Sequence, residues 1–180
     1  MTGRQAYWVM TPRRAYWMLA IITATVYGAM AFWTFPGITY GAGGLTPFDQ
    51  RYGGYTTDDA RTFLGGLNLQ GRILYVGPQY VLGMFFPALL AVALAGAVQR
   101  LVTIRALKWA LFGAIVIGMV ANYTENSLIT ALLKNPDPAT DAAVRMASRA
   151  TVIKTVMTGL AMAGIAITLV LTFFRNRKTP

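Results

Sequence analysis

Hydrophobic residues gather in four long stretches of the chain, and polar residues gather between them. Each stretch is about as long as the roughly 20 residues that an α-helix needs to cross the hydrocarbon core of a membrane. We therefore expect an all-α integral membrane protein, a four-helix bundle that forms a single domain over residues 1–180. Its spans are expected at residues 16–35, 72–98, 107–133 and 151–174.

The longest polar segment, residues 36–71, joins the first two spans. Its glycines and prolines predict turns as far as Gly54. Thr57 is then expected to cap a short helix whose first turn carries Asp58 and Asp59, which suit the positive end of a helix dipole. The apolar residues of this helix share one face: Phe63, Leu64 and Leu67. We expect an amphipathic helix on the membrane surface or over the bundle.

Small residues and prolines mark two of the spans. Ala20, Ala24 and Gly28 lie four residues apart on the first span, so another helix could approach closely there. Pro78 and Pro87 interrupt the second span and predict a kink or a broken first turn. A polar loop, residues 134–150, is expected to separate the third and fourth spans.

Composition supports the membrane assignment and excludes several kinds of chemistry. Only 12% of the residues are charged, whereas a soluble domain would carry about 25%. The chain has no cysteine and no histidine, which excludes disulfides, thiolate metal sites and histidine-ligated haem. We predict no metal and no cofactor, although a lipid, a quinone or a pigment could still be bound.

The formal net charge of +10 is unevenly distributed. Basic residues without any acid occupy the N-terminal arm, the connection between the second and third spans, and the tail at 175–180. The positive-inside rule then places both termini in the cytoplasm, in a multi-pass protein of the bacterial inner membrane. Because membrane topology accounts for the charge, we expect membrane lipids rather than nucleic acid as partners.

Aromatic and basic residues alternate at the start of the chain. Amphipathic rings beside arginine are typical of the headgroup layer. We expect the N-terminal arm, residues 1–14, and the start of the first span to form an interfacial anchor, with docking of a partner subunit as the alternative. The residues of this anchor are Tyr7, Trp8, Arg13, Arg14, Tyr16 and Trp17.

The third span contains an unusual polar group, Asn122, Glu125 and Asn126. An unpaired carboxylate within a membrane span is costly, and Lys154 of the fourth span lies at a similar depth. We expect a Glu125–Lys154 ion pair, aided by Arg72 or Arg149. Three roles remain open for it: a buried network that sets the helix register, a proton or substrate relay, and a site for a headgroup or the polar end of a pigment. Tyr75, Gln79 and Tyr80 of the second span could join this network.

A second polar motif lies in the first loop, where Asp49 and Arg51 precede Gly54 and Tyr55. We expect a turn that is stabilised by a local ion pair or by an aspartate capping the backbone. A functional role is the alternative.

These motifs together resemble a widespread, uncharacterised family of small four-span bacterial membrane proteins. The resemblance rests on five short patterns within residues 46–165: Asp49-x-Arg51-x-x-Gly54-Tyr55, Gly71-Arg72-x-x-Tyr75, Phe86-Pro87, Glu125-Asn126 and Thr151-x-x-Lys154. It implies a four-helix fold and a Glu/Asn–Lys polar centre, but no reaction. Gly83 stands where the family often has an acid, which argues against an acid-dependent activity.

No familiar catalytic motif is present. We expect a non-catalytic accessory or assembly subunit of a larger membrane complex, for example a respiratory or photosynthetic one, that packs against other integral membrane subunits through small-residue helix faces. One alternative is a small transporter or channel lined by the polar centre. The other is a lipid- or isoprenoid-modifying enzyme, which would need a headgroup pocket beside Arg72 and Glu125.

Overall fold

The computed structural model describes residues 11–135 and 141–177. Within them, four helical rods are long and apolar enough to cross a membrane. The protein is therefore an all-α, multi-pass membrane protein, as the sequence predicts. The rods consist of α1 (Pro12–Ala29), η1 (Met30–Thr34) and α2 (Phe35–Gly41); α4 (Leu69–Leu74), η3 (Tyr75–Gln79) and α5 (Tyr80–Leu101); α6 (Arg105–Lys134); and α7 (Asp141–Arg177).

The helices extend beyond the expected spans. The first rod continues through Pro36 to Gly41, and α7 begins at Asp141, so much of the loop expected over residues 134–150 is helical. Hydropathy marks the part of a helix that matches hydrocarbon, whereas a helix with polar residues can continue into water.

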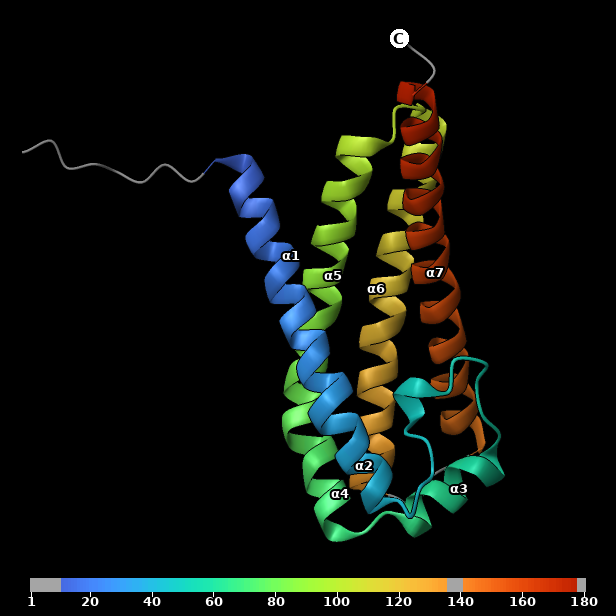
Figure 1. Cartoon of the computed structure of the whole chain (residues 1–180). Coiled ribbons are helices and arrows are strands. Elements are labelled where there is room, and N and C mark those ends of the chain that lie inside the picture. The colour runs from blue at the N-terminus through green and yellow to red at the C-terminus, as the bar shows by residue number, and fades with distance from the viewer. Residues whose placement is uncertain (1–10, 136–140, 178–180) are drawn as a thin grey trace, which may run out of the picture.

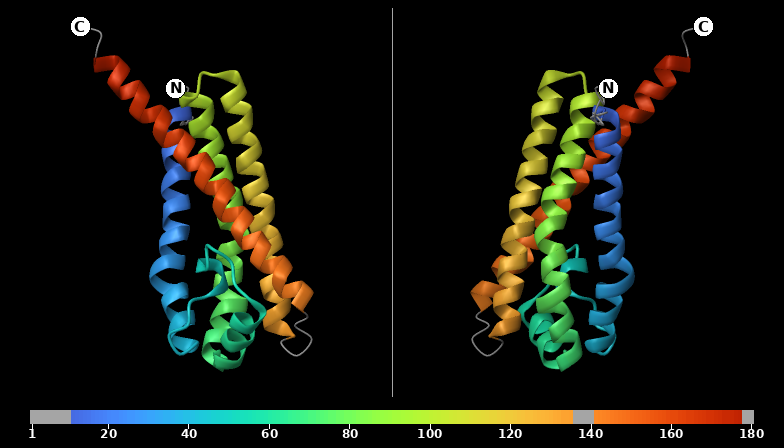
Figure 2. Two further views of the ribbon diagram at one scale, coloured as in Figure 1. Left: turned by 90° about the vertical axis from the view of Figure 1, so that its right-hand side faces the viewer. Right: turned by 90° about the vertical axis from the view of Figure 1, so that its left-hand side faces the viewer.

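The four rods form a bundle in which α7 packs along α6, α6 packs on α5, and α5 packs on α1 (Figure 1). Helix α7 crosses the other helices obliquely (Figure 2). We call the end of the bundle that carries residues 42–68 the loop end, and the end where α1 begins and α7 finishes the terminal end. The 3-10 helix η2 (Phe48–Gln50) and the helix α3 (Thr57–Gly66) lie at or near the loop end.

Two π-helical turns lie side by side in the first and second rods. Pro36 follows η1 closely, and Pro78 lies within η3. Proline has no N–H to donate to the hydrogen bonds of the helix. The wider turn η1 lets the N–H of Phe35 bond to the carbonyl of Met30. Between the two turns, the buried Thr34 hydroxyl donates to Gln79 Oε1 at 2.5 Å. The predicted irregularity near Pro78 is therefore a π turn, matched by another in the neighbouring rod.

Pro87 leaves a second gap in the hydrogen-bond ladder, and α6 fills it. The Gly83 carbonyl would normally accept from residue 87, but proline has no donor. Asn126 Nδ2 donates to this carbonyl instead, at 2.7 Å. Such replacement by a side chain of a neighbouring helix allows proline within a membrane helix.

The loop between the first two rods is folded onto the bundle. Its helix α3 is capped by Thr56, not by Thr57 as expected: the Thr56 hydroxyl accepts from the Asp59 N–H, and the Asp59 carboxylate accepts from the Thr56 N–H. This capping box places the cap one residue earlier. The hydrogen bonds from Thr56 lower the pKa of Asp59.

The apolar face of α3 packs against the bundle and not on the membrane surface. Phe63 is completely buried, and its ring centroid lies 4.7 Å from that of Phe48. Leu64 and Leu67 are buried in the same cluster. The sequence allows this helix to lie on the membrane surface or over the bundle, and in the structure it lies over the bundle.

Gly54 brings this loop against α7. Its φ of +87° is unfavourable for residues with a side chain. A Cβ at this position would also lie 2.8 Å from Ser148 Oγ. That oxygen accepts a hydrogen bond of 2.8 Å from the N–H of Tyr55. Glycine thus permits both the turn and the contact with α7.

We predict that Gly54→Ala destabilises the protein by about 1–2 kcal/mol through the left-handed conformation alone. Gly53→Ala is the matched control, because Gly53 does not have a positive φ and a Cβ there meets nothing within 4 Å. Thermal unfolding in a mild detergent measures both. Equal midpoints for the two variants would contradict this account of the turn.

Candidate functional site

A buried ion pair lies near the loop end of the bundle. The Glu125 side chain is completely buried, and its carboxylate accepts from Lys154 Nζ. Its other oxygen accepts from the Thr151 hydroxyl at 2.5 Å. Lys154 also donates to the backbone carbonyl of Asp49 at 3.4 Å. These contacts connect α6, α7 and the loop.

Asp49 does not form the local ion pair that the sequence suggests. Its buried carboxylate accepts from the Tyr75 hydroxyl. Arg51 instead donates from Nε to the Thr46 carbonyl at 2.9 Å, and its guanidinium lies 5.7 Å from the Phe48 ring centroid. The Phe48 ring thus serves Arg51 as a cation–π partner, in place of the Asp49 carboxylate that the sequence suggested.

Tyr55 adds a buried hydroxyl near the ion pair. It has no hydrogen-bond partner within the described part of the chain. Burial raises the pKa of Tyr55, and the negative charge of Glu125 raises it further. Tyr55 is therefore protonated and neutral at physiological pH.

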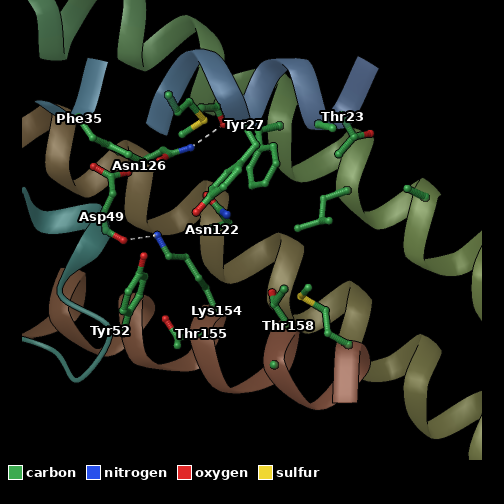
Figure 3. A pocket seen from close by; sticks show the side chains of 18 of the residues that line it. Thr23, Tyr27, Phe35, Asp49, Tyr52, Asn122, Asn126, Lys154, Thr155 and Thr158 are labelled. Carbon is green, nitrogen blue, oxygen red and sulfur yellow. Dashed lines mark hydrogen bonds between the residues drawn. The ribbon is translucent and has the colours of Figure 1, made fainter. Parts of the chain in front are cut away.

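A cavity of about 590 Å³ lies between α1, α5, α6 and α7 and reaches the turn at Asp49 (Figure 3). Most of its wall is apolar, formed by residues that include Ala20, Ala24, Phe86, Leu90, Ala93 and Met162. Most of its polar lining lies toward the loop end, at Asp49, Tyr52, Asn122, Asn126, Lys154, Thr155 and Thr158. Thr23 and Tyr27 of α1 also line it, and the Thr23 hydroxyl donates to the Leu19 carbonyl of its own helix. The cavity therefore has a polar end and an apolar body.

The lining follows α7 from Lys154 to Met162, which corresponds to about 12 Å of helix. Around Met162 and beyond it, toward the terminal end, a separate apolar cluster packs the helices together. Its members include Val98, Val102, Leu111, Ile115, Ala161 and Ile165. The lining does not include them, so the cavity occupies only part of the length of the bundle.

Small side chains create this space. Ala20 and Ala24 face the cavity, where the sequence led us to expect a closely packed helix. Gly159 lies on the opposite wall, and a Cβ there would meet nothing within 4 Å. Gly28, the third member of the small-residue face, is not among the lining residues and also has open space around it.

The structure brings together most of the predicted polar centre. Asn122, Asn126 and Lys154 line the cavity, and Glu125 lies behind Lys154. Arg72 does not join them, because its guanidinium donates to the Leu133 carbonyl. The pocket beside Arg72 that a headgroup-modifying enzyme would need is therefore not formed by the cavity.

The second-span residues that could have joined the centre have other roles. Gln79 pairs with Thr34, and Tyr75 pairs with Asp49. Tyr80 is exposed.

Sequence reasoning missed the threonines on α7. Thr155 and Thr158 follow Thr151 at steps of four and seven residues, so all three occupy one helix face. Lys154 lies on the same face of the helix. The helical spacing of these three threonines with Lys154 is the sequence signal that could have identified Thr155 and Thr158 as site residues.

Part of the predicted interfacial anchor lies outside the described residues, namely Tyr7 and Trp8. Arg13, Arg14 and Trp17 are exposed at the terminal end. The Tyr16 ring lies 4.1 Å from the guanidinium carbon of Arg100, a cation–π contact between α1 and α5.

No protein-family model, curated protein or solved structure matches this chain. The resemblance to the uncharacterised four-span family therefore stays an expectation from the short motifs. In residues 11–135 and 141–177, no group of three or more acidic side chains could hold a metal ion.

We predict that Lys154→Met destabilises the protein by about 3–5 kcal/mol, because it leaves Glu125 buried without a cation. The double variant Lys154→Met/Glu125→Leu should recover most of this loss, since Thr151 keeps its hydrogen bond to the Ala147 carbonyl. Thermal unfolding in detergent measures both.

Lys134→Met is the matched control for this test, because Lys134 is an exposed lysine at the end of α6. It should leave the unfolding midpoint nearly unchanged. A double variant that is less stable than Lys154→Met would contradict the assignment of the cost to an unpaired buried carboxylate.

Proposed function

We propose that this protein binds an amphiphilic molecule of the lipid class in the cavity between α1, α5, α6 and α7. The observation that carries the proposal is the polarity of the lining, which is apolar along most of its length and polar near Lys154 and Asn122. Ligand sites typically combine an apolar wall with a few polar groups that orient the ligand. Membrane lipids, quinones and pigments share this division between head and tail.

A channel accounts less well for the same geometry. A conducting path must continue along the bundle, but the lining ends near Met162 and an apolar cluster follows. Glu125, which a transporter hypothesis places in the path, is completely buried behind Lys154 and Thr151. We therefore favour binding over conduction.

The proposed role is non-catalytic, and it is compatible with an accessory subunit whose bound amphiphile serves a larger complex. That part stays a prediction, because every membrane protein presents apolar faces to lipid. We also propose a location in the bacterial inner membrane, with the terminal end facing the cytoplasm. Its support is the exposed basic residues at that end, Arg13, Arg14, Arg100, Arg105 and Arg175.

A cavity-filling substitution tests the proposal. Gly159→Leu places a larger side chain in the cavity, at a position where a Cβ has free space. The protein is purified in mild detergent from its native membrane, and the bound amphiphiles are extracted and measured by mass spectrometry. We expect the wild type to retain a ligand in about stoichiometric amount, and Gly159→Leu to lose most of it.

Gly113→Leu provides the matched control. Gly113 is an exposed glycine of α6 outside the cavity, and a Cβ there also meets nothing within 4 Å. This variant should retain the ligand as the wild type does. Equal ligand content in all three proteins would overturn the proposal. A larger complex that co-purifies with the wild type would identify the host of an accessory subunit.

A further inference from the structure

The charges around the cavity indicate what kind of head it accepts. We infer that the amphiphile has an uncharged head with at least one oxygen that accepts hydrogen bonds, such as an alcohol, a quinone or an acylglycerol. This inference rests on the proposed function and deepens it. It depends on which charges line the cavity and how each of them is already paired.

Within the described residues, the lining contains one cation and one acid, and each already has a bonding partner. Lys154 is the cation and Asp49 the acid among the described lining residues. The ammonium of Lys154 is paired with Glu125, and the Asp49 carboxylate accepts from Tyr75. Arg72, a further cation that the sequence suggested, is bonded to the Leu133 carbonyl. The site therefore offers no unpaired positive charge to an anion.

A phosphate head would be poorly matched to this arrangement. Its charge would approach an ammonium that is already shared between the Glu125 carboxylate and the Asp49 carbonyl. Burying a charge without its own partner is unfavourable. A cationic head would have to approach the Asp49 carboxylate, which already accepts from Tyr75, and the ammonium of Lys154 beside Asp49 would repel it.

A neutral oxygen has suitable partners. An ammonium has three donors, and Lys154 uses two of them on Glu125 and Asp49. The third remains for a head oxygen. Asn122 lines the same part of the cavity, and its amide, which can both donate and accept, has no partner among the side chains and backbone groups described. A hydroxyl or carbonyl head can use both groups.

Photo-crosslinking in a bilayer tests the head preference directly. The full-length protein is placed in nanodiscs of phosphatidylcholine with a hexadecanol probe that carries a diazirine in its chain, and crosslinks are located by mass spectrometry. We expect crosslinks on α7 near Met162 and on α1 near Ala24, two walls of the cavity. Competitors with the same chain are hexadecanol, hexadecyl phosphate and hexadecylamine.

For the wild type, we expect hexadecanol to compete about tenfold more strongly than the phosphate or the amine, the ratio that one hydrogen bond to a charged group provides. Equal or stronger competition by the phosphate would overturn the uncharged head, while cavity crosslinks would still support the proposed function. An absence of cavity crosslinks, with no difference between Gly159→Leu and Gly113→Leu, would instead overturn the proposed function itself.

A change of the ion pair should change the preference. Glu125→Gln removes the charge that pairs with Lys154, so we expect competition by hexadecyl phosphate to improve about tenfold while competition by hexadecanol changes less than about threefold. An unchanged preference in a folded Glu125→Gln protein would contradict the charge argument.

Asn122→Leu is the second test of the head preference if Glu125→Gln does not fold, because this variant keeps the Glu125–Lys154 ion pair. It removes one neutral partner of the head, so hexadecanol should compete about tenfold less strongly than with the wild type. The amount of probe captured without competitor reports the binding of the chain separately. Unchanged competition by hexadecanol would contradict the role of Asn122 in binding the head.

Discussion

The buried contact between Glu125 and Lys154 is the interaction on which the loop end depends. In a medium of low dielectric constant, neither charge is tolerable alone, so each fixes the position of the other. Thr151 and the Asp49 carbonyl supply further hydrogen bonds. Because these groups come from two helices and a loop, one electrostatic requirement determines how α6 and α7 align and where the loop docks, and it also determines the polar end of the cavity.

A second constraint is the backbone of the proline-containing rods. Each proline removes an N–H, and a membrane interior offers no water to replace it. The chain compensates with two π turns at Pro36 and Pro78, and with the Asn126 amide at the Gly83 carbonyl. Gly83 has a physical role here, since a Cβ would lie 3.0 Å from Asn126 Nδ2. The residue that stands in place of an acid thus makes room for a structural hydrogen bond.

The sequence predicts the four spans well, because the need to bury about 20 apolar residues leaves a strong signal. Pairing of Glu125 with Lys154 was predictable for a similar reason, the cost of isolated charges at equal depth. The partners of Asp49 and Arg51 were not, since they depend on how a loop of more than 20 residues folds back. The partner of Arg72 was not predictable either, because it is a backbone carbonyl at the end of α6. The cavity itself was not predictable, because alanine and glycine faces are equally suited to close helix packing and to an open space.

The paired π turns have a consequence for how the two rods are aligned with each other. A π turn contains one extra residue, and one residue rotates an α-helix by about 100°. Every side chain beyond η1 or η3 is therefore rotated relative to an uninterrupted helix. The first and second rods stay in contact on both sides of the two turns, α1 with α5 and α2 with α4, so the sequence of each rod is matched to this change of phase. A shortening of either rod by one residue at this level would rotate the side chains on one side of the turn by about 100°, and would turn its contact face away from the other rod.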